Sequence, residues 1–282
     1  MNSELNIKII TGSELRKMQL LQLDMILELD RVCRVHDIPY ILIGGSLLGA
    51  VRHHGYIPWD DDADIAMLRE DYERFKTVCD EMNSSICWFQ DFTTDSEYRW
   101  GYGKLRRTGT TYIRAGQEHL KCQTGVCVDV FPLDDIPRSI IGQGIQDFVC
   151  YCLRKILWSE VARVQYTGLK KAWFTLLSKI PIRTVYKVLH VYTRKSHNDT
   201  AHKVRILLFP SIGKLYRKAE LPLRFGFPKK WVQERSEYEF EGHKLYGTKD
   251  YDAFLSYEYG DYMKLPPESD RESHAPVSAY SF

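Results

Sequence analysis

The spacing of hydrophobic residues in the first third of the chain predicts a long helix followed by a short strand. Apolar residues recur at helical intervals from Met18 to Cys33, and Thr11 and Glu14 upstream of them have the spacing of a capping box. An uninterrupted apolar run at 40–43 then ends in two glycines, which is typical of a short buried strand.

The same reading continues through the first half of the chain. It predicts a short helix from Ser46 to about residue 53, a strand that ends at Met67, and a helix over 71–82. Further strands are predicted near residues 87–90, 102–106, 110–114 and 126–131. These elements indicate a small mixed sheet with flanking helices, an α/β fold of the α+β type.

The second half of the chain changes character. Apolar residues follow helical stripes over 141–156 and 185–192, and Lys and Arg occupy the other faces. The tail from 246 to 282 is rich in Tyr, Pro and acidic residues, which predicts loops and short elements. We therefore expect three segments: a core over 1–137, a basic helical subdomain over 138–230, and a C-terminal segment over 231–282 that packs back on the core.

The composition adds one strong feature, which is an uneven distribution of charged residues along the chain. The 282 residues are 44% hydrophobic and 27% charged, as in ordinary globular proteins, and their net charge is only +2. Residues 138–230, however, carry 19 Lys and Arg against 4 Asp and Glu, and the rest of the chain carries 20 against 33. Such asymmetry indicates an anionic partner. An anionic membrane surface and phosphorylated substrates are the favoured candidates, because no nucleic-acid-binding module is recognisable.

The basic helices themselves allow two interpretations. Apolar stripes flanked by Lys and Arg suit helices that lie on an anionic membrane, and they equally suit a helical subdomain with solvated cations. Seven cysteines without a disulfide framework indicate a reducing compartment. The N-terminus does not have the pattern of a signal peptide, and no run of about 18 apolar residues could span a membrane. We expect a cytoplasmic protein that can work at the inner face of the cytoplasmic membrane.

The sharpest chemical pattern is Gly44-Gly45-Ser46 followed by Asp60, Asp62 and Asp64. A strand that ends in two glycines before a helix lets a phosphate approach free backbone N–H groups, although a plain tight turn gives the same letters. Two carboxylates two positions apart on a strand share a face and repel each other unless a cation lies between them. Mg²⁺ favours such oxygen ligands, with substrate phosphates completing its shell. The pattern predicts metal-assisted phosphoryl transfer.

Further charged residues fit the same hypothesis. Asp129 stands alone in the apolar strand predicted at 126–131, where an unpaired carboxylate is costly. It is a candidate third metal ligand, and pairing with a basic residue is the alternative. Asp134 and Asp135 follow Pro132 and are interpreted as loop acids. Arg52 and Lys104 are candidate phosphate-binding cations, and plain surface charge is the alternative for both.

Three blocks of residues together make the sequence resemble a known family. Residues 43–65, 128–134 and 259–263 are similar in order and spacing to the LicD family signature, whose related fukutin group transfers ribitol phosphate from CDP-ribitol. The one departure is Ala63, where a larger aliphatic residue is common, and it leaves the carboxylates in place. The resemblance implies a nucleotidyltransferase-like fold and a phosphotransferase that moves phosphocholine from CDP-choline to a sugar of teichoic acid or lipopolysaccharide.

The resemblance also implies roles for particular residues. Asp62, Asp64 and Asp129 would form the catalytic centre and bind Mg²⁺, with Mn²⁺ as an alternative. The donor nucleotide's phosphates would meet Gly44, Gly45, Ser46, Arg52 and Lys104. The acceptor glycan would be met on a polyprenyl carrier at the membrane. Ribitol phosphate transfer and a non-catalytic module that binds nucleotide or glycan remain the alternative functions.

Overall fold

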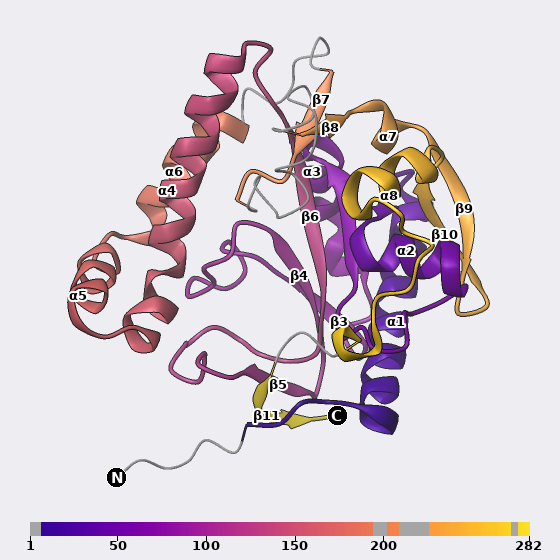
Figure 1. Cartoon of the computed structure of the whole chain (residues 1–282), viewed down its shortest axis with the longest axis horizontal. Coiled ribbons are helices and arrows are strands. Elements are labelled where there is room, and N and C mark those ends of the chain that lie inside the picture. The colour runs from indigo at the N-terminus through magenta and orange to yellow at the C-terminus, as the bar shows by residue number, and fades with distance from the viewer. Residues whose placement is uncertain (1–6, 194–201, 209–225, 272–275) are drawn as a thin grey trace.

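A mixed nine-stranded sheet forms the centre of the computed structural model, which describes residues 7–193, 202–208, 226–271 and 276–282 (Figure 1). The main path runs β3-β4-β6-β2-β1-β10-β9. Its strands are β1 (Ile41–Leu42), β2 (Asp64–Leu68), β3 (Cys87–Gln90), β4 (Gly103–Arg107), β6 (Cys127–Asp135), β9 (Arg235–Phe240) and β10 (His243–Thr248). β2 and β6 pair in parallel, as do β1 and β10, and the remaining neighbours on this path are antiparallel. The α+β prediction is confirmed.

Smaller strands attach at two places. β7 (Lys203–Arg205) pairs with β6 and with β8 (Phe227–Pro228), and β5 (Thr111–Arg114) pairs with β11 (Val277–Ser281) in a separate two-stranded sheet. Parts of the second half of the chain thus complete sheets begun by the first half.

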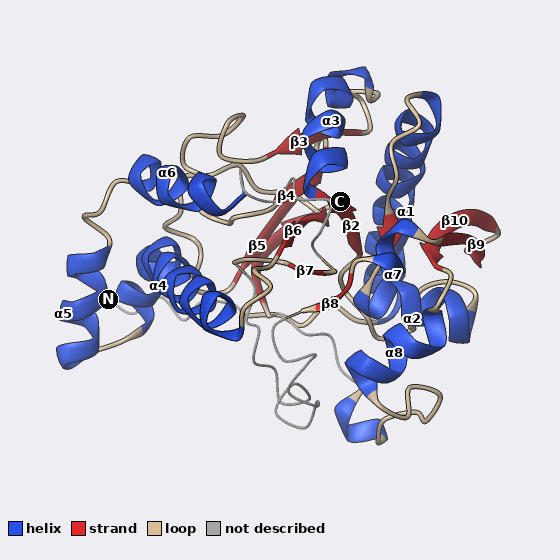
Figure 2. Cartoon of the chain, turned by 90° about the horizontal axis from the view of Figure 1, so that it is seen from above, coloured by secondary structure: helices blue, strands red, loops and turns tan. Residues whose placement is uncertain are grey.

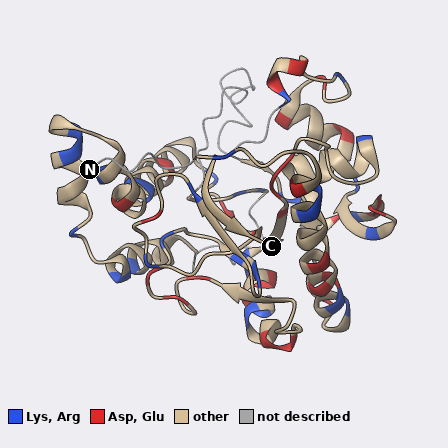
Figure 3. Cartoon of the chain, turned by 90° about the horizontal axis from the view of Figure 1, so that it is seen from below, with Lys and Arg blue, Asp and Glu red and all other residues tan. Residues whose placement is uncertain are grey.

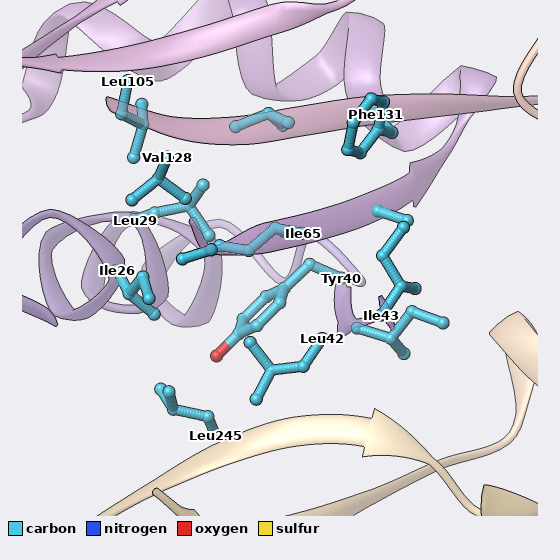
Figure 4. Close-up of a cluster of buried hydrophobic side chains, with 14 of the residues drawn as sticks. Ile26, Leu29, Tyr40, Leu42, Ile43, Ile65, Leu105, Val128, Phe131 and Leu245 are labelled. Carbon is cyan, nitrogen blue, oxygen red and sulfur yellow. The ribbon is translucent and has the colours of Figure 1, made fainter. Parts of the chain in front are cut away.

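The core lies between the sheet and the helices of the N-terminal half. Figure 4 shows Ile26 and Leu29 of helix α1 (Gly12–Val35) facing Ile65 and Val128 of the sheet. All four side chains are fully buried, and burying one such side chain stabilises the fold by roughly 1.5–3 kcal/mol. This packing fixes β2 and β6, the strands that carry the predicted acids.

The N-terminal helices flank these strands. Helix α2 (Gly44–His53) follows β1 directly and contacts β2, and α3 (Arg69–Val78) follows β2 and packs on β2 and β6. A short 3-10 helix, η1 (Cys79–Glu81), ends this segment. The two predicted helices therefore exist, and each begins two residues earlier than its sequence pattern indicated.

Three helices, α4 (Ile140–Gln165), α5 (Gly168–Leu177) and α6 (Ile182–Thr193), form a unit that we call the helical arm. The arm lies on the opposite side of the central strands from α1, α2 and α8 (Tyr251–Tyr259) (Figures 1 and 2). It has a hydrophobic cluster of its own, which includes Leu153, Leu157, Val185 and Leu189. Lys and Arg are spread over its outer surface (Figure 3). In the part of the chain that the structure describes, no helix is long and apolar enough to cross a membrane.

The C-terminal residues add both strands and helices. The short helix α7 (Lys230–Gln233) precedes β9, and α8 and the 3-10 helix η4 (Glu268–Asp270) follow β10. β10 lies beside β1, so this segment reaches the centre of the sheet.

Two local predictions are wrong. Thr11 precedes α1 without a side-chain capping bond, and Glu14 accepts a hydrogen bond from the Tyr280 hydroxyl of β11. Asp134 and Asp135 are not loop acids: β6 continues through Pro132, and both residues are buried. Arg69 pairs with Asp134 through two hydrogen bonds of 2.8 and 2.7 Å, so the buried charge is compensated.

Candidate active site

The acidic loop at residues 60–63 is held by side-chain amides of α1. The Nε2 group of Gln19 donates to the Asp60 carbonyl at 2.9 Å, and that of Gln22 donates to the Asp61 carbonyl at 3.1 Å. Both glutamines are almost completely buried within the apolar face of α1. Buried amides of this kind need partners, and here the partners are carbonyls of the loop that carries the candidate ligands. The helix thereby fixes the path of this loop.

Ser46 and Ile43 clamp the backbone of Asp64. The Ser46 hydroxyl accepts a hydrogen bond from the Asp64 N–H at 2.9 Å, and the Ile43 N–H donates to the Asp64 carbonyl at 3.2 Å. Both contacts join the start of β2 to the start of α2. In this structure Ser46 therefore positions a candidate metal ligand, and its hydroxyl lies at the glycine turn where the donor phosphates were predicted.

The two glycines make room for the carboxylates. A Cβ atom on Gly45 would lie 2.3 Å from Oδ2 of Asp60, and a Cβ on Gly44 would lie 3.2 Å from Oδ2 of Asp64. Gly44 also has a φ of +55°, which side-chain-bearing residues rarely adopt. The absence of side chains at Gly44 and Gly45 thus lets the N-terminus of α2 lie close to the carboxylates of Asp60 and Asp64.

Negative charge accumulates around Asp64. Burial, and then the charges of Asp62, Asp129 and Asp60, raise the pKa of the Asp64 carboxyl well above its usual range, and Lys104 opposes this effect. The carboxylate oxygens of Asp60, Asp61 and Asp62 come within 4.8 Å of one another. A group of hard oxygen donors that repel one another in this way fits a divalent cation such as Mg²⁺.

Asp129 lies beside this group but has a partner of its own. It is directly opposite Asp64 in the parallel β2–β6 pair, and its N–H donates to the Ala63 carbonyl at 2.8 Å. Its carboxylate forms a close ion pair with Lys104 of β4, and both side chains are largely buried. The alternative foreseen for Asp129, pairing with a basic residue, is what the structure shows.

A cavity of about 740 Å³ opens in front of the acids. Its wall includes Gly44, Gly45, Arg52, Asp60, Asp62 and Asp64, together with residues of α8 and the segment after it. Three candidate residues do not line it: Ser46 and Asp129 are not part of its wall, and Lys104 lines a separate depression of about 50 Å³. The structure therefore brings the glycine turn, Arg52 and two of the three predicted ligands to one cavity.

Arg52 reaches the cavity from the last turn of α2. Its Nη1 donates to the Tyr262 carbonyl at 2.7 Å, and its Nε donates to the His53 ring at 3.0 Å. Burial lowers the pKa of this guanidinium, which nevertheless remains a cation at neutral pH. Arg52 thus carries positive charge to the rim and attaches α2 to the C-terminal segment.

Three residues of the cavity wall were not on the predicted list. Asp60 was part of the sequence pattern, but its place beside Gly45 required the fold. Tyr259 directs its hydroxyl toward the acids, within 3.8 Å of the Gly44 Cβ position, and burial followed by the charges of Glu258 and Asp64 raises the pKa of this phenol. Glu258, one residue earlier on α8, lines the same wall. The motif at 259–263 was the available signal for this helix.

The fold and the site together define a nucleotidyltransferase-type domain: a mixed sheet that presents clustered carboxylates at a glycine turn. Comparison with known proteins agrees, because residues 37–143 match the family model described as LicD/FKTN/FKRP, nucleotidyltransferase domain. The chain is also 28% identical over 280 residues to the lipopolysaccharide cholinephosphotransferase LicD of Haemophilus influenzae, covering 94% of this chain and 97% of that protein. A short segment of 43 residues is 49% identical to an uncharacterised protein of Rickettsia typhi, covering 15% of this chain and 14% of that protein.

These matches confirm the resemblance to the LicD family that the sequence motifs indicated. They also confirm the prediction of a transferase.

Proposed function

We propose that this protein transfers phosphocholine from CDP-choline to a hydroxyl group of a cell-surface glycan precursor, of the lipopolysaccharide or teichoic acid type. The observation that carries the proposal is the single cavity in which Asp60, Asp62 and Asp64 face the N-terminus of α2. The end-to-end similarity to a lipopolysaccharide cholinephosphotransferase supports the choice of donor and acceptor.

The reaction needs a nucleophile, a leaving group and charge neutralisation. The acceptor oxygen attacks the phosphorus that carries choline, the bond from that phosphorus to the CMP oxygen breaks, and CMP leaves with the bonding electrons. Asp62 and Asp64 are the proposed Mg²⁺ ligands, with Asp60 adjacent. A bound Mg²⁺ supplies neutralisation of the charge that develops on the leaving phosphate. The backbone N–H group at Gly45 orients the phosphates at the start of α2, and Arg52 adds a cation at the rim.

Asp129 and Lys104 have linked roles in this proposal. Asp129 is either the third metal ligand or the acceptor of the proton from the attacking hydroxyl. Either role requires its carboxylate to leave Lys104, and that exchange frees the Lys104 ammonium for a donor phosphate. The ion pair observed here is then the resting arrangement of the two side chains.

An assay of CMP release tests the proposal. The full-length protein is incubated with Mg²⁺, CDP-choline and lipopolysaccharide core oligosaccharide, and phosphocholine addition is followed by mass spectrometry. Asp62→Asn should lower turnover by about 100-fold or more, since a metal ligand contributes several kcal/mol to the transition state. Asp80→Asn removes an exposed carboxylate of η1 and should leave the rate unchanged. Full activity of Asp62→Asn, or CMP release only from CDP-ribitol, would contradict the assignment.

The same proposal places the protein at the inner face of the cytoplasmic membrane, where a polyprenyl-linked acceptor would be found. Leu169, Trp173 and Leu176 follow one face of α5 and are 91%, 57% and 58% exposed. The arm around them has 8 Lys and Arg against 2 Asp and Glu over residues 140–193. Exposed apolar side chains beside cations suit an anionic bilayer. Trp173→Glu should reduce co-sedimentation with phosphatidylglycerol vesicles, and equal binding by both proteins would refute the contact.

A further inference from the structure

Glu258 is an acidic residue of the cavity wall that the proposed reaction does not use. It lies near the end of α8, and its carboxyl accepts a hydrogen bond from the Gly44 N–H. Its other oxygen, Oε2, is buried and has no hydrogen-bond partner among the described residues. A buried oxygen without a hydrogen-bond partner costs free energy. The position of this oxygen beside a candidate ligand cavity therefore requires an explanation.

The surroundings of Glu258 leave its charge uncompensated. No Lys, Arg or His in the part of the chain that the structure describes forms an ion pair with it. Burial raises the pKa of this carboxyl to about 8, and the Gly44 N–H opposes the effect. The cavity therefore contains a carboxyl group whose ionised form a bound cation would stabilise.

Aromatic rings make up much of the same wall. Phe254 lies one helical turn before Glu258 on α8, and its ring centre is 5.3 Å from that of Phe227. Phe227 lines the cavity, as do Tyr262 and Trp59, whereas the Phe254 ring is fully buried and packs against Phe227. Aromatic faces attract cations, and the attraction is strongest where water is excluded.

A carboxylate among aromatic rings matches one kind of cation better than others. A primary ammonium or a guanidinium requires several hydrogen-bond acceptors when it is buried. A quaternary ammonium has no N–H group, so it needs only negative charge and polarisable surface at van der Waals distance. The Glu258 carboxylate can supply that charge from behind the wall surface, because its Oε2 is closed off from solvent that would screen it.

The position of Glu258 relative to the acid cluster also fits. Gly44 touches both sites: its N–H reaches Glu258, and its Cβ position is 3.2 Å from Asp64 Oδ2. In phosphocholine only two carbons separate the phosphate ester oxygen from the quaternary nitrogen. A phosphate at Gly44 would therefore place its cationic end within reach of Glu258.

We propose that Glu258, with Phe227 and the other aromatic rings of this wall, forms the subsite that selects a quaternary ammonium headgroup on the donor. This inference rests on the proposed phosphocholine transfer and goes further, because it names the residue that distinguishes choline from a neutral alcohol such as ribitol. Glu258 binds the headgroup and takes no part in the bond changes at phosphorus.

Calorimetric titration of the full-length protein with Mg²⁺ tests the subsite. The probes are CDP-choline, CDP-glycerol, which has an uncharged headgroup, and CMP. The wild type should bind CDP-choline about tenfold or more tightly than CDP-glycerol, which corresponds to about 1.4 kcal/mol. Glu258→Gln should lose most of this preference and bind CDP-glycerol and CMP as before. Glu268→Gln removes an exposed carboxylate from η4 and should behave as the wild type.

The possible outcomes separate the two proposals. If Glu258→Gln keeps the preference for CDP-choline, or weakens all three ligands equally, the subsite is refuted and phosphocholine transfer stands. If the wild type prefers CDP-glycerol, both proposals are refuted. Glu258→Asp keeps the charge on a shorter stem and should retain part of the preference, which separates a charge effect from a folding defect. Loss of the preference in both variants, with CMP binding also lost, would identify Glu258 as a structural residue.

Discussion

Replacing Glu258 by glutamine should make the stability of the metal-free protein less sensitive to pH. The carboxyl has a pKa of about 8 in the folded chain, because of its burial, and an ordinary value of 4.5 when exposed. Below pH 4.5 the group is neutral in both states and has no effect. Between the two values the unfolded chain can ionise and the folded chain cannot, so the free energy of unfolding falls as the pH rises.

The difference between the two pKa values sets the size of the effect. One unit corresponds to about 1.36 kcal/mol, so the full shift is worth roughly 4–5 kcal/mol as an upper bound. Glutamine resembles the neutral acid in shape and does not titrate. The free energy of unfolding of Glu258→Gln, minus that of the wild type, should therefore grow with pH and level off above pH 8.

Urea denaturation in EDTA between pH 5 and 9 measures this difference. The control is Glu268→Gln, whose carboxylate is exposed in both states and whose difference from the wild type should stay near zero. A Glu258→Gln difference that does not change with pH would show that the carboxyl is hydrated in the folded protein. In that case the argument from its burial fails.

Four other substitutions test packing at the site and elsewhere in the fold. Gly45→Ala brings a Cβ against Asp60 and should cost about 1–3 kcal/mol in thermal unfolding, whereas Gly144→Ala in the second turn of α4 meets no atom and should stabilise by about 0.5–1 kcal/mol. Equal effects of the two would contradict the close approach. Arg69→Met removes the partner of buried Asp134 and should cost about 3–5 kcal/mol, most of which Asp134→Leu in the same chain should restore. If the double variant is no more stable than Arg69→Met alone, the pair stabilises the fold through the packing of its two side chains and not through charge compensation.

The sequence predicted well those parts of the fold that depend on local pattern. The strand at 87–90 has the predicted ends, and the helical stripe from Met18 to Cys33 lies within α1. In each case an apolar period coincides with turn or breaker residues, so local preference and burial agree. Asp62 and Asp64 could be selected for the same reason, because acids that run directly into a buried strand are unusual.

Contacts between distant segments were beyond such reasoning. The pairing of Asp129 with Lys104 depends on the register of β4 against β6, which no short pattern specifies. β9 and β10 join the sheet beside β1 although some 190 residues separate them in sequence. Glu258 lies in the tail for which the sequence predicted loops and short elements, and only the docking of α8 against the start of α2 half-buries it and closes off its Oε2 from solvent.

The arrangement of the site explains why the linear motif at residues 43–65 identifies the acid cluster well. It also explains why this motif does not include the wall formed by α8. Most of the contacts that shape the acid cluster are made by or to backbone atoms: Ser46 and Ile43 hold the peptide groups of Asp64, and Gln19 and Gln22 hold the loop before it. Backbone geometry of this kind depends on glycines and short polar residues at fixed spacing, so residues 43–65 carry a strong signal. The opposite wall, formed by α8, presents side chains to the cavity, and side chains can change while the fold is kept. We therefore expect the residues that choose the donor to lie on α8 and the residues that assemble the reaction centre to lie at the glycine turn.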